Sequence, residues 1–477
     1  MSPSGSWLEE IAPAVGPKGF SVDTDDISPW LTDWRGRYTG KAAAMVSPAT
    51  TEEVSAVVKI ANTHGIPIVP QGGNSGMVGG ATPDESGQSI LLSLRRMNQI
   101  REIDADNQLV VCDAGVILQN LHDALEPHGQ RFPLTLGGKG SATVGGLVST
   151  NAGGTQVLRH GTMRALVAGM EAVLPDGSIF NSLAALKKDN RGYDLKQLLI
   201  GGEGTLGIVT AATLRTCPAL VDRCVAWVGV ESPQAAYRLF QFLNAMESRH
   251  LEGFEIVPAS CLDVVLRHIP DTRPPLESAA PWNALIEIVR DRPLAQDPAQ
   301  MMEILLEQAF KKGLAIDAAI ASNETQAEAF WKLRDSIAEA ERADGPALQH
   351  DISVPVHKMA DFISSASPKI EAAFPGTEVA AFGHMGDGNV HFHVKGPAGV
   401  QPKQWMSKNA LEISPLVHDL VLQYGGSISA EHGIGQTKRQ ELARLSSDAQ
   451  LLALRSIKTA IDPNNIMNPG KLVPLAS

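Results

Sequence analysis

Three clusters of glycine in the N-terminal half constrain the fold of this chain most strongly. They lie in residues 69–83 (VPQGGNSGMVGGATP), 136–154 (LGGKGSATVGGLVSTNAGG) and 201–207 (GGEGTLG). The first cluster follows an apolar run at residues 66–69, which is typical of a strand. Glycine-rich loops after strands expose several backbone N–H groups, and these bind a diphosphate without basic side chains. Together, the three clusters predict an extended groove for a long ligand.

The third cluster also matches the GxGxxG fingerprint of dinucleotide-binding folds, at Gly202, Gly204 and Gly207. That fingerprint requires a strand before it and a helix that begins at the last glycine. Residues 208–214 (IVTAATL) are instead rich in β-branched side chains and predict a strand. The sequence therefore argues against a Rossmann fold.

Histidines and a carboxylate gather in two segments of the C-terminal half. Residues 381–394 (AFGHMGDGNVHFHV) carry three imidazoles, and residues 429–439 (SAEHGIGQTKR) carry a carboxylate beside a fourth: His384, His391, His393, Glu431 and His432. Two imidazoles and one carboxylate are a common set of ligands for a catalytic divalent metal with an open coordination position. A further histidine beside such a metal can take a proton near neutral pH.

Two pairings of the histidines are open. A tight glycine-rich reversal could bring His384 and His391 to one ion. Alternatively, His391 and His393, which are two apart on a strand, face the same way and could chelate together. Zn(II) suits the donor set, with Mn(II) and Fe(II) as competitors.

Composition limits the partners and the compartment. The chain has 477 residues, 43% hydrophobic composition and a net charge of −12, so it can bury a large core, and neither nucleic acid nor an anionic membrane is expected as its main partner. The four cysteines show no CxxC spacing, which argues against an iron–sulfur cluster. No apolar run approaches the ~18 residues of a membrane span, and the N-terminal residues do not resemble a signal peptide. We therefore expect a cytoplasmic protein, with peripheral membrane contact left open.

The pattern of elements changes near residue 218. Before it, the sequence predicts helices at residues 51–64 and 116–128, and strands at residues 66–69, 89–94 and 109–113. After it, amphipathic helical patterns at 232–249 and 298–312 alternate with strand-like runs at 223–230 and 284–289. This alternation has no βαβ rhythm and predicts an α+β domain on an antiparallel sheet.

Together these features resemble the vanillyl-alcohol oxidase/PCMH flavoprotein superfamily, in its FAD-linked oxidase branch. That branch holds D-lactate dehydrogenases, D-2-hydroxyglutarate dehydrogenases and the glycolate oxidase catalytic subunit. The resemblance spans about residues 35–475 and rests on six segments in order: PQGGNSGMVGG, GLVSTNAGGTQVLRHG, GGEGTLGIVT, GHMGDGNVHFHV, AEHGIGQTKR and DPNNIMNPGK. It implies an α+β fold, with a PCMH-type FAD-binding domain of two α/β subdomains and a cap domain whose antiparallel sheet is flanked by helices. The expected parts are residues 1–218 (FAD-binding), 219–426 (substrate and cap) and 427–477 (returning to the FAD domain).

The resemblance places FAD along the glycine clusters and near the C-terminus. The residues it assigns to the cofactor are Pro70, Gln71, Gly72, Gly73, Asn74, Ser75, Gly76, Gly79, Gly80, Leu136, Gly137, Thr143, Gly145, Gly146, Asn151, Gly153, Gly154, Gly161, Gly207, Ile208, Val209 and Asn468. The phosphate loop holds no histidine, so we expect noncovalent FAD, and His160 is the nearest imidazole in the later glycine segment.

The resemblance also implies the roles of the histidine segments. His384, His391 and Glu431 match the metal ligands, His432 the catalytic base, and Arg334 the arginine that pairs with the substrate carboxylate. The implied reaction is hydride transfer from a D-2-hydroxy acid to flavin N5, giving the 2-oxo acid. Electrons would pass to an external acceptor, which could be a quinone, an electron-transfer flavoprotein or a cytochrome, and a homodimer is compatible with these features.

Three positions depart from the hydroxyglutarate-type pattern. Gln349 replaces a lysine, Ala338 a threonine and His393 an asparagine. A second carboxylate on the substrate would therefore lack two binding partners, the cation of the lysine and the hydroxyl of the threonine. We expect a monocarboxylic substrate that is D-lactate-like or has a larger apolar R group, with His393 beside it. The alternatives are a D-2-hydroxyglutarate or D-malate dehydrogenase, a flavin subunit of a multi-chain glycolate-type oxidase that is inert alone, and an alkyl-glycerone-phosphate synthase-like or aryl-alcohol oxidase-like enzyme.

Overall fold

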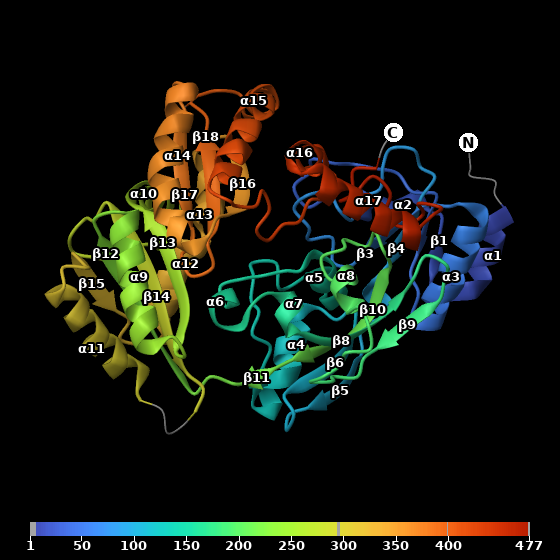
Figure 1. Cartoon of the computed structure of the whole chain (residues 1–477), viewed down its shortest axis with the longest axis horizontal. Coiled ribbons are helices and arrows are strands. Elements are labelled where there is room, and N and C mark those ends of the chain that lie inside the picture. Colours follow the sequence, from blue (N-terminus) through green and yellow to red (C-terminus); the bar gives the residue numbers. More distant parts are fainter. Residues whose placement is uncertain (1–5, 293–295, 398, 476–477) are drawn as a thin grey trace. The chain divides into compact units, whose positions relative to one another are not determined.

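The computed structural model describes residues 6–292, 296–397 and 399–475 (Figure 1). The chain divides into two compact units. The first comprises Met1–Gly154, His160–Ala219 and Glu431–Ser477, and the second comprises Thr155–Arg159 and Leu220–Ala430.

One part of the first unit is built on a four-stranded sheet with the order β1-β2-β4-β3. Its elements are α1 (Ser6–Val15), β1 (Phe20–Ser21), α2 (Thr24–Ile27), η1 (Ser28–Trp30), β2 (Ala44–Val46), α3 (Thr51–His64), β3 (Ile68–Gln71), β4 (Ile90–Ser93) and η2 (Leu94–Arg96). The bounds of α3 confirm the predicted helix. Thr50 caps it by accepting the Glu53 N–H, and Gly65 ends it at φ 66°, where a residue without a β-carbon is not strained.

The other part of the first unit is built on a five-stranded antiparallel sheet with the order β5-β6-β10-β8-β9. Its elements are β5 (Ile100–Asp104), β6 (Leu109–Asp113), α4 (Leu118–Leu125), η3 (Glu126–His128), β7 (Gln130–Arg131), α5 (Val144–Thr150), α7 (Met163–Leu166), β8 (Val167–Val173), β9 (Ile179–Ser182), α8 (Lys196–Leu199), β10 (Ile208–Arg215) and β11 (Cys217–Pro218). Helix α6 (Val157–His160) lies where the chain passes between the units. The GxGxxG segment leads into strand β10 and not into a helix, so the argument against a Rossmann fold is confirmed.

The C-terminal residues add α16 (Arg439–Leu445) and α17 (Asp448–Ile461) to the first unit. The chain then runs parallel to the start of β3. The Ile68 N–H donates to the Ile466 carbonyl at 2.7 Å, and the Asn468 N–H donates to the Ile68 carbonyl at 2.8 Å. These bonds bring the end of the sequence to the strand that precedes the first glycine cluster.

The second unit contains a seven-stranded sheet with the order β15-β12-β14-β13-β17-β18-β16, and every neighbouring pair is antiparallel. Its elements are β12 (Asp222–Val230), α9 (Pro233–Glu247), β13 (Leu251–Pro258), α10 (Ala259–His268), β14 (Trp282–Arg290), α11 (Pro298–Lys311), β15 (Asp317–Ile320), α12 (Glu324–Asp335), α13 (Ile337–Asp344), β16 (Ala347–Ser353), η4 (Val356–Lys358), α14 (Met359–Ala373), β17 (Glu378–His384), β18 (Asn389–Lys395) and α15 (Pro402–Gln423).

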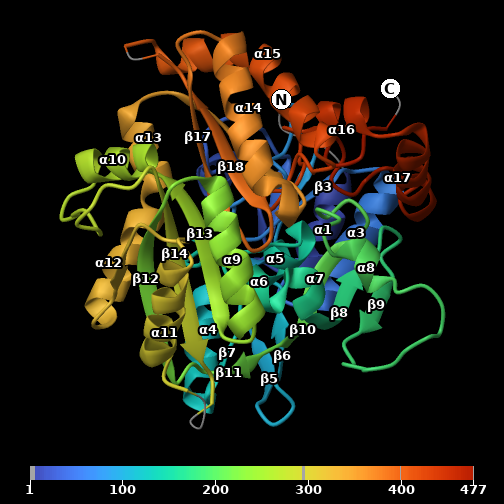
Figure 2. The same cartoon turned by 60° about the vertical axis from the view of Figure 1, so that its left-hand side comes forward.

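Helices cover both faces of this sheet. Helices α9, α11, α14 and α15 pack on the face that carries Phe254 and Phe392, and Figure 2 shows α9 and α14 along it. Helices α10, α12 and α13 pack on the opposite face, which carries Trp227 and Phe382. Successive residues of a strand point to opposite faces of the sheet, so the strands contribute side chains to the hydrophobic core on each face. This arrangement confirms the predicted α+β fold with a cap of antiparallel strands flanked by helices.

Candidate active site

The glycine clusters of the first unit pack directly on one another. A β-carbon at Gly73 would lie 1.7 Å from the backbone oxygen of Ser141, so the first and second clusters approach too closely for a side chain at that position. A β-carbon at Gly204 would lie 2.5 Å from the Pro70 ring, so the third cluster packs against the end of β3. The structure therefore brings the three clusters together in one unit.

Buried polar atoms beside these clusters have no partner among the described residues. They are Gln71 Oε1, Thr143 Oγ1 and Asn468 Oδ1. The amide nitrogens are engaged, because Gln71 Nε2 donates to the carbonyls of Trp30 and Ala81 at 3.0 and 2.9 Å. Buried polar groups left unpaired are costly, so these acceptors indicate a ligand with hydrogen-bond donors. FAD offers such donors on its ribityl chain, its isoalloxazine ring and its adenine, and the residues present therefore fit FAD.

The remaining residues assigned to FAD by resemblance also lie in the first unit. They lie within α5 and β10 and in the segments next to β3, α5, α6 and β10: Gly73, Asn74, Ser75, Gly76, Gly79, Gly80, Leu136, Gly137, Gly145, Gly146, Asn151, Gly153, Gly154, Gly161, Gly207, Ile208 and Val209. Asn74 and Asn151 have φ of 52° and 51°, a left-handed conformation that asparagine tolerates better than most residues.

The C-terminal motifs contact the first glycine cluster. Gln436 Nε2 donates to the Gly79 carbonyl at 2.8 Å, and Thr437 Oγ1 donates to the Val78 carbonyl at 3.1 Å. Asn468 Nδ2 donates to the carbonyls of Gly80 and Glu203 at 2.9 and 2.8 Å. The residues after the His432 segment and those around Asn468 therefore help to hold the loop in place.

The imidazoles of the second unit share one face of its sheet. The register pairs Glu255 of β13 with His384 of β17, and Asp351 of β16 with His391 of β18. His393 follows two residues later on the same face, opposite Gln349. The tight turn between β17 and β18 thus places His384 near His391, with ring centroids 5.5 Å apart.

A buried carboxylate ties the first imidazole to the predicted substrate arginine. Glu255 is 1% exposed, and it accepts from His384 Nδ1 at 2.5 Å and from Arg334 Nε at 2.8 Å. Burial alone would raise the pKa of Glu255, but the charges of His384 and Arg334 hold that pKa down, at about 2. The carboxylate is therefore ionised, and it directs the other ring nitrogen of His384 away from β13.

The two candidate metal imidazoles lie within reach of one ion. A ligand atom of His384 and one of His391 are within 4.8 Å of each other. The third ligand of the predicted set, Glu431, stays a prediction. Glu431 is joined by a peptide bond to Ala430, the last residue of the second unit. Burial, and next the charge of Arg334, lower the pKa of His391 well below its usual value. The neutral imidazole that results is the form that binds metals, so these residues fit a divalent ion.

His393 is held by a different partner. Its Nδ1 contacts Glu341 Oε2 at 2.5 Å, and Glu341 is 2% exposed on helix α13. The Phe382 ring separates this pair from Arg334, with the guanidinium carbon 5.1 Å from the ring centroid. His393 is thus engaged by Glu341, which favours His384 over His393 as the partner of His391.

Neither Glu255 nor Glu341 belongs to a motif that can be recognised in the sequence. Glu255 could have been noticed, because an acidic residue occupies a core-facing position of the apolar strand LEGFEIVP. Glu341 gives no such signal, since the helix segment AEAERAD alternates charged and small residues as surface helices do.

Glu431 and His432 begin the C-terminal part of the first unit, and both are partly buried. The role of His432 as the catalytic base stays a prediction.

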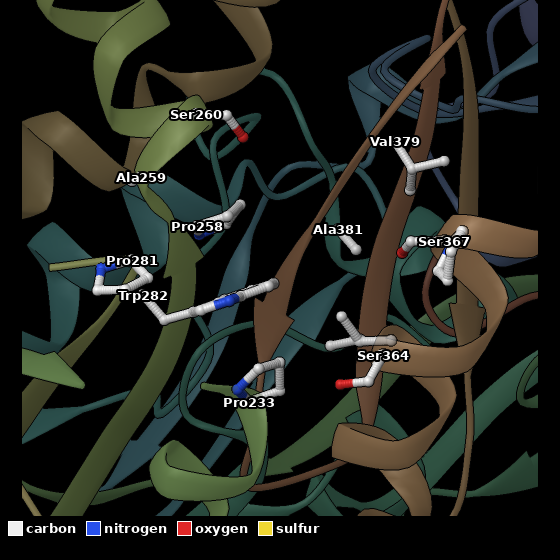
Figure 3. Close-up of a pocket in the computed structure, with 12 residues that line it drawn as sticks. Pro233, Pro258, Ala259, Ser260, Pro281, Trp282, Ser364, Ser367, Val379 and Ala381 are labelled. Carbon is white, nitrogen blue, oxygen red and sulfur yellow. The ribbon is translucent and has the colours of Figure 1, made fainter. Parts of the chain in front are cut away.

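A separate cavity of about 440 Å³ lies in the second unit, where β13 and β17 part. The two strands pair only at Glu255 and Ile256, and beyond them Pro258, Trp282, Ser364 and Ala381 line the opening (Figure 3). Its lining includes no titratable side chain and no predicted site residue. The cavity is therefore not the candidate site.

Both halves of the chain match known protein families. Residues 42–182 match the FAD binding domain family, and residues 221–472 match the family of FAD linked oxidases, C-terminal domain. The chain belongs to the FAD-linked oxidases. It is an FAD-dependent oxidoreductase of the vanillyl-alcohol oxidase/PCMH superfamily, as its motifs predicted.

Similar proteins support the same class. The D-2-hydroxyglutarate dehydrogenase, mitochondrial, of Danio rerio is 37% identical over 97% of this chain and 84% of its own length. The protein of the same name from Arabidopsis thaliana is 34% identical over 98% and 81%. A crystal structure of p-cresol methylhydroxylase with substrate bound matches 98% of this chain and 96% of its own with a TM-score of 0.75, and at 18% identity it shows the fold alone. The relatives support FAD-dependent oxidation of a D-2-hydroxy acid.

The predicted cytoplasmic location is contradicted by these relatives, which are named mitochondrial. The prediction rested on composition and on the absence of signal-peptide features, and neither property distinguishes the mitochondrial interior from the cytoplasm. Among the described residues, no helix is long and apolar enough to cross a membrane.

Proposed function

We propose that this enzyme uses FAD and a divalent metal to oxidise a D-2-hydroxy acid to the 2-oxo acid. The observation that carries the proposal is the Glu255 carboxylate, which links Arg334 to His384. This carboxylate fixes two side chains in one rigid group. One is a guanidinium suited to bind a substrate carboxylate, and the other is an imidazole suited to bind a metal. Bound FAD would supply the hydride acceptor, at N5, and would be held noncovalently.

Arg334 would bind the substrate carboxylate. Its Nε is used by Glu255, so the two terminal nitrogens remain for a bidentate pair. Arg334 lies on helix α12 against the Phe382 ring and its side chain is 10% exposed, which strengthens the pair by excluding water.

His384, His391 and Glu431 would hold the metal, with Zn(II) the preferred ion and Mn(II) or Fe(II) as competitors. The metal would supply a Lewis acid that lowers the pKa of the substrate hydroxyl. His432, the neighbour of Glu431, would take the hydroxyl proton on an imidazole nitrogen as hydride leaves the same carbon.

The R group of the substrate would lie near His393. The neighbouring position on β16 is the neutral Gln349, and the partner of His393 is the buried acid Glu341. A second substrate carboxylate would meet no lysine at position 349 and would face the negative charge of Glu341. We therefore propose a monocarboxylic substrate, D-lactate-like or with a larger apolar R group. The names of the relatives favour D-2-hydroxyglutarate as the second candidate.

The electrons would leave to an external quinone, electron-transfer flavoprotein or cytochrome. The names of the relatives support a mitochondrial location.

Dye reduction by the purified holoenzyme tests the proposal. D- and L-lactate, D-2-hydroxyisocaproate, D-malate and D-2-hydroxyglutarate are compared before and after chelation and after return of Zn(II), Mn(II) or Fe(II). We expect D-selective activity that is lost on chelation and restored by one metal. His432→Ala should lower kcat by about 10²–10⁴-fold, whereas His357→Ala, at an exposed position, should leave kcat unchanged. Full activity without metal, or in the His432 variant, would refute the mechanism.

A further inference from the structure

Glu203, in the glycine cluster at residues 201–207, has a backbone conformation that would cost less free energy if the residue were glycine. Glu203 has a φ of 49°, a left-handed conformation that side chains larger than asparagine seldom adopt, and it stands between Gly202 and Gly204. A residue kept in a strained conformation indicates that its side chain is needed.

That side chain holds a turn 231 residues away in the sequence. Glu203 Oε1 accepts the Ile434 N–H at 2.8 Å, and Oε2 accepts the Gly435 N–H at 2.7 Å. A β-carbon at Gly433 would lie 2.9 Å from Oε1, so the turn wraps closely around the carboxylate. Both oxygens are therefore occupied by the backbone N–H groups that lie two and three residues after His432.

Glu203 is itself fixed from two other directions. Its backbone N–H donates to the Ser149 carbonyl at 2.8 Å, and its carbonyl accepts from Asn468 Nδ2 at 2.8 Å. The residue is 8% exposed. The carboxylate is therefore a rigid support, because helix α5 and the C-terminal motif both hold its backbone.

We propose that Glu203 is a positioning residue that fixes the Glu431–His432 segment for metal binding and catalysis. The inference rests on the proposed function, because it assigns a purpose to those two residues. By holding the amides of Ile434 and Gly435, close after His432, the Glu203 carboxylate limits the positions that the Glu431 carboxylate and the His432 ring can take.

Two variants and a matched control test the inference in the FAD-loaded enzyme. Glu203→Gln keeps the shape of the side chain but leaves only one of its two acceptor oxygens. Glu203→Gly removes the carboxylate and also relieves the strain of the positive φ. The control is Glu171→Gln, which neutralises another buried carboxylate of the same unit, bonded to Thr51 and Thr210. The dissociation constant for Zn(II) is measured by competition with a chelating dye, together with FAD content and kcat.

We expect both Glu203 variants to retain FAD and to bind Zn(II) about 10–100-fold more weakly, with a matching loss of kcat, as for other residues that orient metal ligands. Glu171→Gln should bind Zn(II) as the wild type does. Zn(II) affinity within twofold of wild type in both Glu203 variants would overturn the inference. Failure of the proposed function would instead appear in the wild type, as an absence of chelator-sensitive activity.

Discussion

Glu255→Gln tests the group that joins the candidate metal site to the substrate arginine. The substitution keeps the volume and removes the charge. It weakens the bonds to His384 Nδ1 and Arg334 Nε, which are 2.5 and 2.8 Å long, at a position that is 1% exposed. Charge-assisted hydrogen bonds contribute about 1.5–3 kcal/mol each, and breaking a buried ion pair costs about 3–5 kcal/mol. We expect the free energy of unfolding to fall by about 3–5 kcal/mol.

Glu255→Gln should also weaken metal binding, because it frees the His384 imidazole. A carboxylate that accepts from the second nitrogen of a metal-binding histidine fixes the ring and raises its basicity, and losing it typically weakens metal binding about 10–100-fold. Zn(II) affinity from chelator competition and stability from urea unfolding measure the two effects separately.

Glu287→Gln is the matched control. Glu287 lies on the adjacent strand β14, 7% exposed on the same face, and pairs with Arg223 at 3.3 Å. Burial raises the pKa of Glu287 to about 7, so its charge contributes little to stability and its loss should leave Zn(II) affinity unchanged. If Glu255→Gln bound Zn(II) as tightly as this control, the proposed orienting role of Glu255 would be wrong.

Two further predictions concern the substrate and the cofactor domain. Gln349→Lys should raise kcat/KM for D-2-hydroxyglutarate relative to D-lactate by at least about tenfold, because it restores a cation beside the R group; an unchanged ratio would place the R group elsewhere. Burial lowers the pKa of Lys471 to about 8, and the side chain is 4% exposed. The unfolded chain then binds more protons than the folded one between pH 8 and about 10.5, so the stability of the FAD-free protein should rise over this interval by about 3 kcal/mol. Lys471→Met should abolish that rise, and an equal rise in the variant would contradict the assignment.

Much of the local structure was predictable from the sequence. Helix α3 begins and ends where its threonine cap and Gly65 indicate, and β6 matches the predicted strand at residues 109–113. The turn between His384 and His391 was also predictable, because glycines at 386 and 388 allow the reversal that makes β17 and β18 neighbours. These features depend on contacts within a few residues, where the identity of each side chain limits the backbone directly.

The contacts of the two supporting carboxylates, Glu255 and Glu203, are determined by the tertiary structure. Glu255 lies 129 residues from His384 in the sequence, and Glu203 lies 231 residues from Ile434. Nothing near either glutamate specifies its partner, because sheet register and loop packing decide which distant groups meet. The family, the glycine clusters and the imidazoles can all be recognised from the order of the amino acids. Only the folded chain decided which buried charges orient them, because a contact across so many residues exists only after the strands and loops between them have packed.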